Sequence, residues 1–336
     1  MRRKHFIGTL LSAACLFPVA AHAVEDEASE AFCQEVVALM ASDDFDALDA
    51  LAEQLRKGER DAHGESRLGR FYLCLSRRIG TERQDVEHWN DWTAWAARWI
   101  RQSPRSPSAH LVAARIPLNL AWSHRGSGYA SGVSAQDWAQ FHEYNAVSAA
   151  YLQEHKRIAQ RDAYWYDLAT QLAARHNQDD EALLAIVDEA SSAFPDYLPL
   201  HLVAMQHFTP RWGGSTAKME AFARRSMATL PAGDRAERYA RLYWAATEMP
   251  LDDALFQQSQ VDWPLMRRGL EDLLARYPTL ENRNGAQRFA CLSGDLATLE
   301  TWQRQLVAHI GMDERFTTAL VEQGRTVCAG NRLGTS

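Results

Sequence analysis

Two glycine-containing segments carry the residues whose types and spacing best suit binding chemistry. One is Trp122-Ser-His-Arg-Gly-Ser-Gly-Tyr-Ala-Ser-Gly-Val133, and the other is Phe208-Thr-Pro-Arg-Trp-Gly-Gly-Ser215. Each offers an arginine, an aromatic ring and backbone N–H groups beside the start of a predicted helix, and a helix N-terminus attracts anions. Arg125 or Arg211 would then hold a carboxylate or a phosphate in the planar fork of its guanidinium group.

The same two segments also fit a purely structural role, which we favour. Their glycines permit tight turns. Trp212 would cover the apolar face of the helix that follows, and the arginines would satisfy carbonyl groups at helix ends. Both interpretations stay open for one set of candidate interaction residues, namely Trp122, Arg125, Gly126, Arg211, Trp212, Gly213, Gly214 and Ser215.

The sequence contains no motif of metal-dependent or nucleophilic catalysis. Neither His-Glu-x-x-His nor Gly-x-Ser-x-Gly occurs. His201 and His207 are six residues apart, which places them on different faces of a helix. Gly126-Ser-Gly128 follows a predicted helix rather than a strand, so it does not form a dinucleotide loop. We therefore predict no catalytic residue, no metal site and no cofactor, and we favour a protein that is not an enzyme.

The cysteines indicate an oxidising compartment. Cys15 lies in the N-terminal segment, and the even set Cys33, Cys74, Cys291 and Cys328 remains. Because two of them lie close together near each end of the chain, we predict the bridges Cys33–Cys74 and Cys291–Cys328. Four buried thiols are the alternative. No Cys-x-x-Cys pair is present to favour zinc.

The first 23 residues have the composition of a secretory signal peptide. Basic residues 2–4 precede an apolar run over 6–20, and residues 21–23 form a small-x-small cleavage site. The sequence predicts cleavage after Ala23 and a periplasmic or secreted protein. A lipoprotein at Cys15 is disfavoured because Ser12, three residues before it, is not aliphatic.

Composition and charge exclude several classes of protein. The chain has 336 residues, of which 46% are hydrophobic and 24% charged, and this is typical of a globular protein with a buried core. Its net charge is -7, and loss of the three basic residues of the signal peptide makes it -10. Such a negative balance disfavours nucleic acids and anionic membrane surfaces. No run after residue 23 is long and apolar enough to span a bilayer. The predicted partner is an unknown protein or peptide.

Helical patterns dominate the chain, and strand patterns are nearly absent. The clearest helix covers 85–102, where Trp89, Trp92, Trp95 and Trp99 share one face at about 100° per residue. We predict helices over 29–41, 43–57, 65–78, 85–102, 107–122, 134–159, 162–176, 179–193, 197–208, 215–229, 233–248, 262–276, 281–292, 295–309 and 313–328.

Internal similarities indicate that these helices form stacked hairpins. Residues 42–49 resemble residues 293–300, and both look like the turn and second-helix start of a tetratricopeptide hairpin. We predict one all-α, tetratricopeptide-like α-solenoid domain over 24–330, followed by a disordered tail over 331–336. A closed α/α toroid is the alternative architecture.

The two glycine-containing segments also carry a family resemblance. Trp122-Ser-His-Arg-Gly126 with Ala130 and Ser134, and Arg211-Trp-Gly-Gly-Ser215 with Met219 and Phe222-Ala-Arg224, resemble the bacterial "domain of unknown function 4034" family. The resemblance covers residues 85–230 and implies a helical, tetratricopeptide-like protein. It implies no activity and supplies no catalytic residue.

The sequence thus predicts an exported, non-enzymatic helical-repeat protein that mediates protein or peptide interactions in the periplasm. The alternative is an envelope glycan-active enzyme of the α/α-toroid type, suggested by the 11 tryptophans and the many carboxylates. Shape discriminates between them. An open superhelix favours the first, and a closed ring with two carboxylates about 5–10 Å apart in a Trp-lined cleft favours the second.

Overall fold

A computed structural model describes residues 19–175, 179–247, 254–311 and 314–333 of the chain. Within these residues the protein is built from helices, and the only β-type pairing is an isolated bridge between Arg60 and Ser66. The all-α prediction is therefore confirmed. The α-helices are α1 (Val19–Ala41), α2 (Phe45–Leu55), α3 (Arg67–Ile79), α4 (Val86–Gln102), α5 (Pro107–Arg125), α6 (Ala135–Glu154), α7 (Lys156–Ala159), α8 (Tyr164–Arg175), α9 (Asp180–Ala193), α10 (Pro199–His207), α11 (Thr216–Ala228), α12 (Arg235–Ala246), α13 (Leu255–Gln258), α14 (Trp263–Arg276), α15 (Leu280–Ser293), α16 (Leu296–Ile310) and α17 (Glu314–Leu333), and the 3-10 turns are η1 (Ala130–Gly132) and η2 (Pro210–Trp212).

Short polar side chains define many of the helix starts. An N-cap side chain that accepts a backbone N–H bond satisfies a donor that the first turn leaves unpaired. Such caps precede α2, α3, α4, α5, α6, α9, α11, α14, α15 and α16, at Asp44, Ser66, Asp85, Ser106, Ser134, Asp179, Ser215, Asp262, Thr279 and Asp295.

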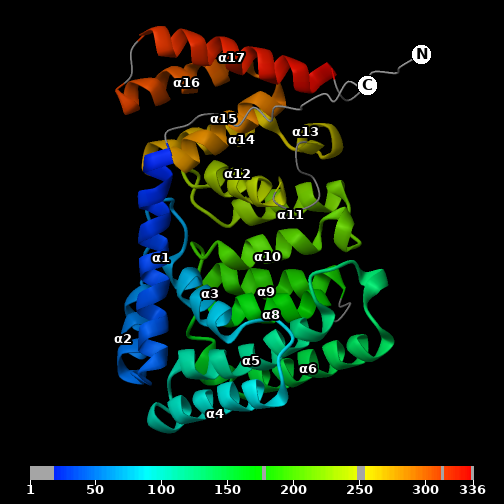
Figure 1. Cartoon of the computed structure of the whole chain (residues 1–336). Helices are drawn as coiled ribbons and strands as arrows, with labels where there is room; N and C mark the ends of the chain where they lie inside the picture. Colours follow the sequence, from blue (N-terminus) through cyan, green and yellow to red (C-terminus); the bar gives the residue numbers. More distant parts are fainter. Residues whose placement is uncertain (1–18, 176–178, 248–253, 312–313, 334–336) are drawn as a thin grey trace, which may run out of the picture.

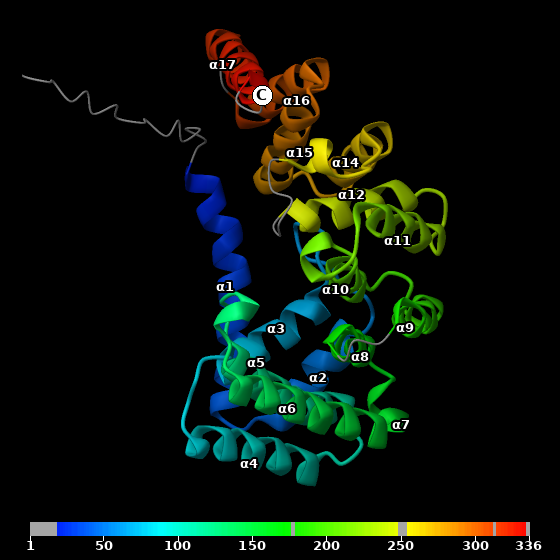
Figure 2. The ribbon, with the colours of Figure 1, turned by 90° about the vertical axis from the view of Figure 1, so that its right-hand side faces the viewer.

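The helices from α4 to α17 form a stack in two layers (Figures 1 and 2). Helices α8, α10, α12 and α15 form an inner layer, and their hairpin partners α9, α11, α14 and α16 form an outer layer. The stack begins at α4 and ends at α17, which lie at opposite ends in both views. Closure of a toroid requires the two ends to meet, so this arrangement agrees with stacked hairpins.

The N-terminal helices run across this stack instead of extending it. Helix α1 lies along its side, and α3 packs on α5 and α8 (Figure 1). The α2–α3 connection, residues 56–66, is called the strap here. It reaches the inner layer, where the His63 carbonyl accepts hydrogen bonds from Arg241 Nη2 (2.8 Å) and Asn282 Nδ2 (3.3 Å). The strap thereby ties the first helices to α12 and α15.

One glycine is essential to this contact. Gly64 has φ +79°, and a Cβ built on it would lie 2.2 Å from Arg241 Nη2 and 2.6 Å from the Tyr277 ring. A side chain at this position would therefore combine backbone strain with a steric clash. The strap can approach α12 this closely only with glycine at position 64.

The tryptophan face predicted for 85–102 forms part of a continuous core. Trp89, Trp95 and Trp99 are buried, and Trp92 is partly buried against the same cluster, which extends from Phe32 to Cys328. No helix among the described residues is long and apolar enough to cross a membrane.

Both predicted disulfides are present. Cys33 of α1 bonds Cys74 of α3, with a Cα–Cα distance of 5.2 Å. Cys291 bonds Cys328 and joins α15 to α17 with a Cα–Cα distance of 5.3 Å. Each bridge therefore connects two helices separated by one other helix in the sequence, as expected for neighbouring hairpins.

Several predicted boundaries differ from the structure. The helix predicted for 134–159 breaks at His155, whose ring stacks on Tyr151 (4.1 Å) while its backbone leaves the helical region. Helix α17 continues to Leu333, into the predicted tail, whereas 334–336 lie outside the described residues. Most of the predicted signal peptide, residues 1–18, also lies outside them, and α1 spans the predicted cleavage site.

A buried ion pair joins the start of the strap to the stack. The Asp162 side chain is fully buried and accepts hydrogen bonds from Arg56 Nε and from the Tyr72 hydroxyl, both at 2.7 Å. Arg56 Nη2 also donates to Ser108 Oγ at 2.6 Å. These four residues connect the C-terminus of α2 with α3, α5 and the segment before α8.

Candidate functional site

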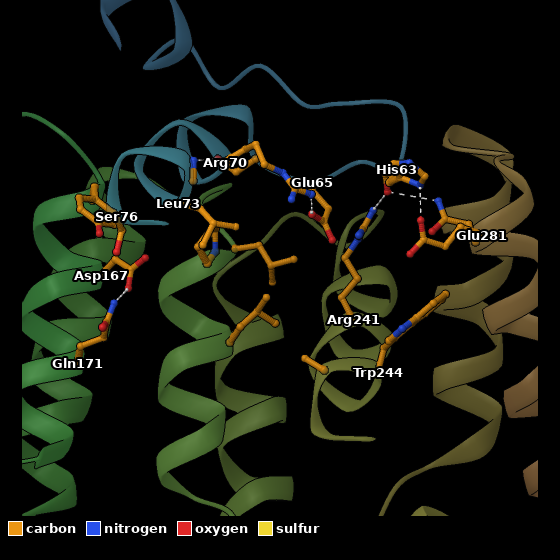
Figure 3. A pocket seen from close by; sticks show the side chains of 18 of the residues that line it. His63, Glu65, Arg70, Leu73, Ser76, Asp167, Gln171, Arg241, Trp244 and Glu281 are labelled. Atoms are coloured by element: carbon orange, nitrogen blue, oxygen red, sulfur yellow. Dashed lines mark hydrogen bonds and ion pairs between the residues drawn. The ribbon is translucent and has the colours of Figure 1, made fainter. Parts of the chain in front are cut away.

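A pocket of about 360 Å³ lies between α3, the strap and the inner layer of helices (Figure 3). Its wall is formed on one side by α3 and the strap and on the other by α5, α8, α10, α12 and α15. The lining residues are His63, Glu65, Ser66, Gly69, Arg70, Leu73, Ser76, Arg115, Tyr164, Asp167, Gln171, Leu198, Pro199, Leu202, Arg241, Trp244, Ala245, Glu281 and Asn282.

The middle of the pocket is apolar. Leu73 on α3 is 38% exposed, although its neighbours Tyr72 and Cys74 are buried. The same pocket is lined by Leu202 of α10 and by Trp244 of α12. A ligand that covers this exposed leucine removes apolar surface from water, which favours binding.

One end of the pocket combines a cation with neutral acceptors. Arg115 Nε donates to Asn119 Oδ1 (2.7 Å) and Ser76 Oγ (3.0 Å), and its Nη1 donates to Gln171 Oε1 (3.0 Å). Gln171 Nε2 in turn donates to Asp167 Oδ1 at 2.8 Å, and Asp167 is buried. This network fixes the orientation of the Arg115 guanidinium group and of the Asp167 carboxylate at the pocket wall.

The other end carries ion pairs that involve the strap. Glu65 pairs with Arg70 (3.1 Å), and His63 Nδ1 lies 3.2 Å from Glu281. Partial burial of Glu65 at the pocket wall raises its pKa, whereas nearby Arg70 opposes this shift. Its side chain stays 56% exposed toward the pocket, so a ligand can reach the carboxyl group.

The first of the two predicted interaction segments has a structural role around Arg125. Helix α5 continues to Arg125, so Trp122 lies in a helix and not in a loop. The Arg125 guanidinium lies over the Trp122 ring (5.7 Å) and donates to the carbonyls of Gly126 and Gly128. Gly126 has φ +65°, which allows the chain to leave the helix.

The second segment forms the predicted corner, but with a different residue against the core. Ser215 caps α11 by accepting a hydrogen bond from the Lys218 N–H (3.2 Å), and Gly213 has φ +87°. Gly214 is required by space, because a Cβ there would lie 2.1 Å from the Phe208 carbonyl oxygen. The predicted burial of Trp212 is wrong.

Trp212 is 41% exposed because the turn η2 directs it outward. Phe208 fills the expected place and stacks on Phe222 with ring centroids 5.0 Å apart. Arg211 is exposed as well.

Trp212→Ala is consequently expected to change the free energy of unfolding by less than about 1 kcal/mol, as for most exposed positions. Phe208→Ala is the matched comparison, and it should destabilise several-fold more because it removes a buried ring. Urea denaturation followed by circular dichroism measures both. Equal losses in the two variants would contradict this placement of the rings.

The pocket residues are ones that sequence reasoning missed. None of the eight predicted interaction residues lines the pocket. Two sequence features could have indicated the pocket. One is Leu73, an apolar residue on the polar side of α3, and the other is the charged strap sequence Asp61-Ala-His-Gly-Glu65. Among the described residues, no group of three or more His, Cys, Asp or Glu side chains is arranged to hold a metal ion.

Comparison of the chain with models of protein families, with curated proteins and with solved structures finds no match in any of the three. The candidate site therefore rests on the geometry and chemistry of the chain itself.

Proposed function

We propose that this protein is an exported, non-enzymatic helical-repeat protein that mediates protein or peptide interactions in the periplasm. The observation that carries the proposal is the pocket under α3 and the strap, where an accessible leucine lies between two charged ends. The proposed ligand is an extended peptide segment with an apolar side chain in the middle. Charged side chains on either side of it would meet the two ends of the pocket.

Two further features support this proposal. Disulfide bridges persist in oxidising compartments, and both bridges here join helices near the ends of the chain. Stacked helix hairpins commonly present an inner face to peptides, and in this chain α3 narrows that face to a pocket. We also propose membership of the "domain of unknown function 4034" family, which adds no activity.

The alternative, a glycan-active enzyme, has one observation in its favour. Glu65 has a raised pKa and shares the pocket with Trp244, as a general acid beside a sugar-stacking ring would. Figure 3, however, shows Asp167 at one end of the pocket and Glu65 and Glu281 toward the other, with Leu73 between them. Glu65 and Glu281 share an end, but each is paired with a basic side chain, Arg70 and His63 respectively, and this suits binding better than glycosidic cleavage.

Leu73→Asp is expected to weaken peptide binding at least about tenfold, because the substitution places a charge in the apolar middle of the pocket. The matched control is Val147→Asp. Val147 is 50% exposed on α6 and does not line the pocket. Fluorescence anisotropy with synthetic peptides that carry an apolar residue between an acidic and a basic residue measures the affinity.

Four outcomes bear on the choice between the two functions. Loss of binding in the Leu73 variant alone supports the interaction module. Equal binding by both variants, or no binding by the unmodified protein, would refute this site. Release of sugars from envelope glycan by the unmodified protein, abolished by Glu65→Gln, would establish the enzyme instead.

A further inference from the structure

A second pocket of about 240 Å³ is lined by Arg60 of the strap and is rich in arginine. Arg60 of the strap, Arg238 and Arg241 of α12, and Arg276 of α14 all line it. These four cationic side chains share the pocket with three acidic residues, Asp196, Asp234 and Glu237. Their individual partners show which of these charges are neutralised inside the protein.

Two of the four arginines are paired with carboxylates. Arg241 Nε lies 2.8 Å from Glu237 Oε1. Arg276 Nη1 lies 2.7 Å from Asp234 Oδ1 and 3.0 Å from Glu237 Oε2. The charges of Arg241 and Arg276 are thus balanced by acidic groups of α12 and of its N-cap.

Arg60 and Arg238 are held by neutral oxygens instead. Arg60 donates to the carbonyls of Gly64 (3.0 Å) and Asp196 (3.1 Å). Arg238 donates to the carbonyl of Pro195 (2.7 Å) and to Ser226 Oγ (3.5 Å). A guanidinium group has five N–H donors, so both residues have more donors than these bonds use.

Burial of Arg238 destabilises its charged form, because its hydrogen-bond partners are neutral oxygens. Only 4% of it is exposed, and its burial, reinforced by the charge of Arg60, lowers its pKa to about 10. An anion placed between Arg238 and Arg60 would offset the repulsion that Arg238 experiences. Among the described residues neither arginine forms an ion pair, and the charges of Asp196 and Glu237 only partly oppose the lowering of the Arg238 pKa.

We propose that this pocket binds an oxyanion, a carboxylate or a phosphate group, between the guanidinium groups of Arg60 and Arg238. Planar guanidinium groups bind both anions through paired, charge-assisted hydrogen bonds. Arg60 belongs to the strap, whereas Arg238 belongs to the inner layer, so the anion would also crosslink these two parts. The site shares Leu198 and Arg241 with the peptide pocket, but the proposal does not depend on the function of that pocket.

Calorimetric titration with inorganic phosphate and, separately, with succinate tests the proposal at constant ionic strength set by chloride. We expect saturable binding of one anion per chain, and the arm that saturates identifies the anion. Arg60→Gln should weaken binding about tenfold or more, since it removes charge-assisted hydrogen bonds. Arg225→Gln is the matched control, because Arg225 is paired with Asp188 on the surface and does not line the pocket.

A second variant moves the affinity in the opposite direction, which misfolding cannot imitate. The Asp196 side chain is exposed at the rim, and its negative charge acts on Arg238. Asp196→Asn should therefore strengthen anion binding about twofold to tenfold. Absence of saturable binding in both arms, equal affinity in Arg60→Gln and Arg225→Gln, or weaker binding by Asp196→Asn would each overturn the proposal.

Discussion

Replacing Asp162 with alanine is expected to lower the free energy of unfolding by about 3–5 kcal/mol. Asp162 is fully buried and neutralises Arg56, whose side chain is only 12% exposed. Its loss would leave the largely buried guanidinium group with only the exposed Glu53 as a counter-ion (2.7 Å) and the Tyr72 hydroxyl without its 2.7 Å acceptor. The variant should also loosen the strap, because Arg56 is its first residue.

The exposed pair between Arg98 and Asp43 provides the matched control. It has bonds of similar length, at 2.9 to 3.2 Å, but its side chains are 44% and 43% exposed. Water screens such a pair, so Arg98→Ala, which leaves Asp43 with its positive φ (+53°) in place, should cost less than about 1 kcal/mol. Urea denaturation of the two variants measures the difference. Similar midpoints would show that the Asp162 pair is not the structural joint inferred here.

Removal of the Cys33–Cys74 bridge is expected to have the second large effect. The bridge closes a loop with a sequence separation of 41 residues, and the chain-entropy model assigns such a loop about 3–4 kcal/mol. The double variant Cys33→Ser/Cys74→Ser should unfold at correspondingly lower urea concentration. It should also bind peptide less tightly, because the bridge fixes α1 against α3, which forms one wall of the pocket.

The same experiment on Cys291→Ser/Cys328→Ser separates stability from binding. That bridge has a separation of 37 residues and lies between α15 and α17, so a similar loss of stability is expected. Its helices contribute less to the pocket, through Glu281 and Asn282 of α15 alone. Unchanged midpoints in both double variants would mean that the bridges do not stabilise the fold.

Local patterns predicted much of this fold. The tryptophan spacing over 85–102 identified the buried face of α4, because a helix repeats its faces at a fixed period. The helix starts predicted at residues 134 and 215 agree with the structure, where Ser134 and Ser215 accept the N-cap hydrogen bonds that the first N–H groups need. The close sequence positions of the cysteines predicted both bridges.

The binding pocket could not be predicted in this way. It depends on contacts such as that between Asn282 and His63, which are 219 residues apart and involve an irregular segment without periodicity. The error at Trp212 has a related cause. Both Phe208 and Trp212 could fill the place beside Phe222, and only the direction of the turn η2 decides between them.

The central claim is that a peptide binds between α3 and the inner layer of helices. Crosslinking of the purified protein with a photoreactive version of the tightest-binding synthetic peptide, followed by peptide mapping, tests it most directly. The account predicts crosslinks in residues 63–76 and in residues 198–202 and 241–245, which line the pocket. Crosslinks confined to the glycine-containing segments 122–133 and 208–215 would contradict it and would restore those segments as the interaction site.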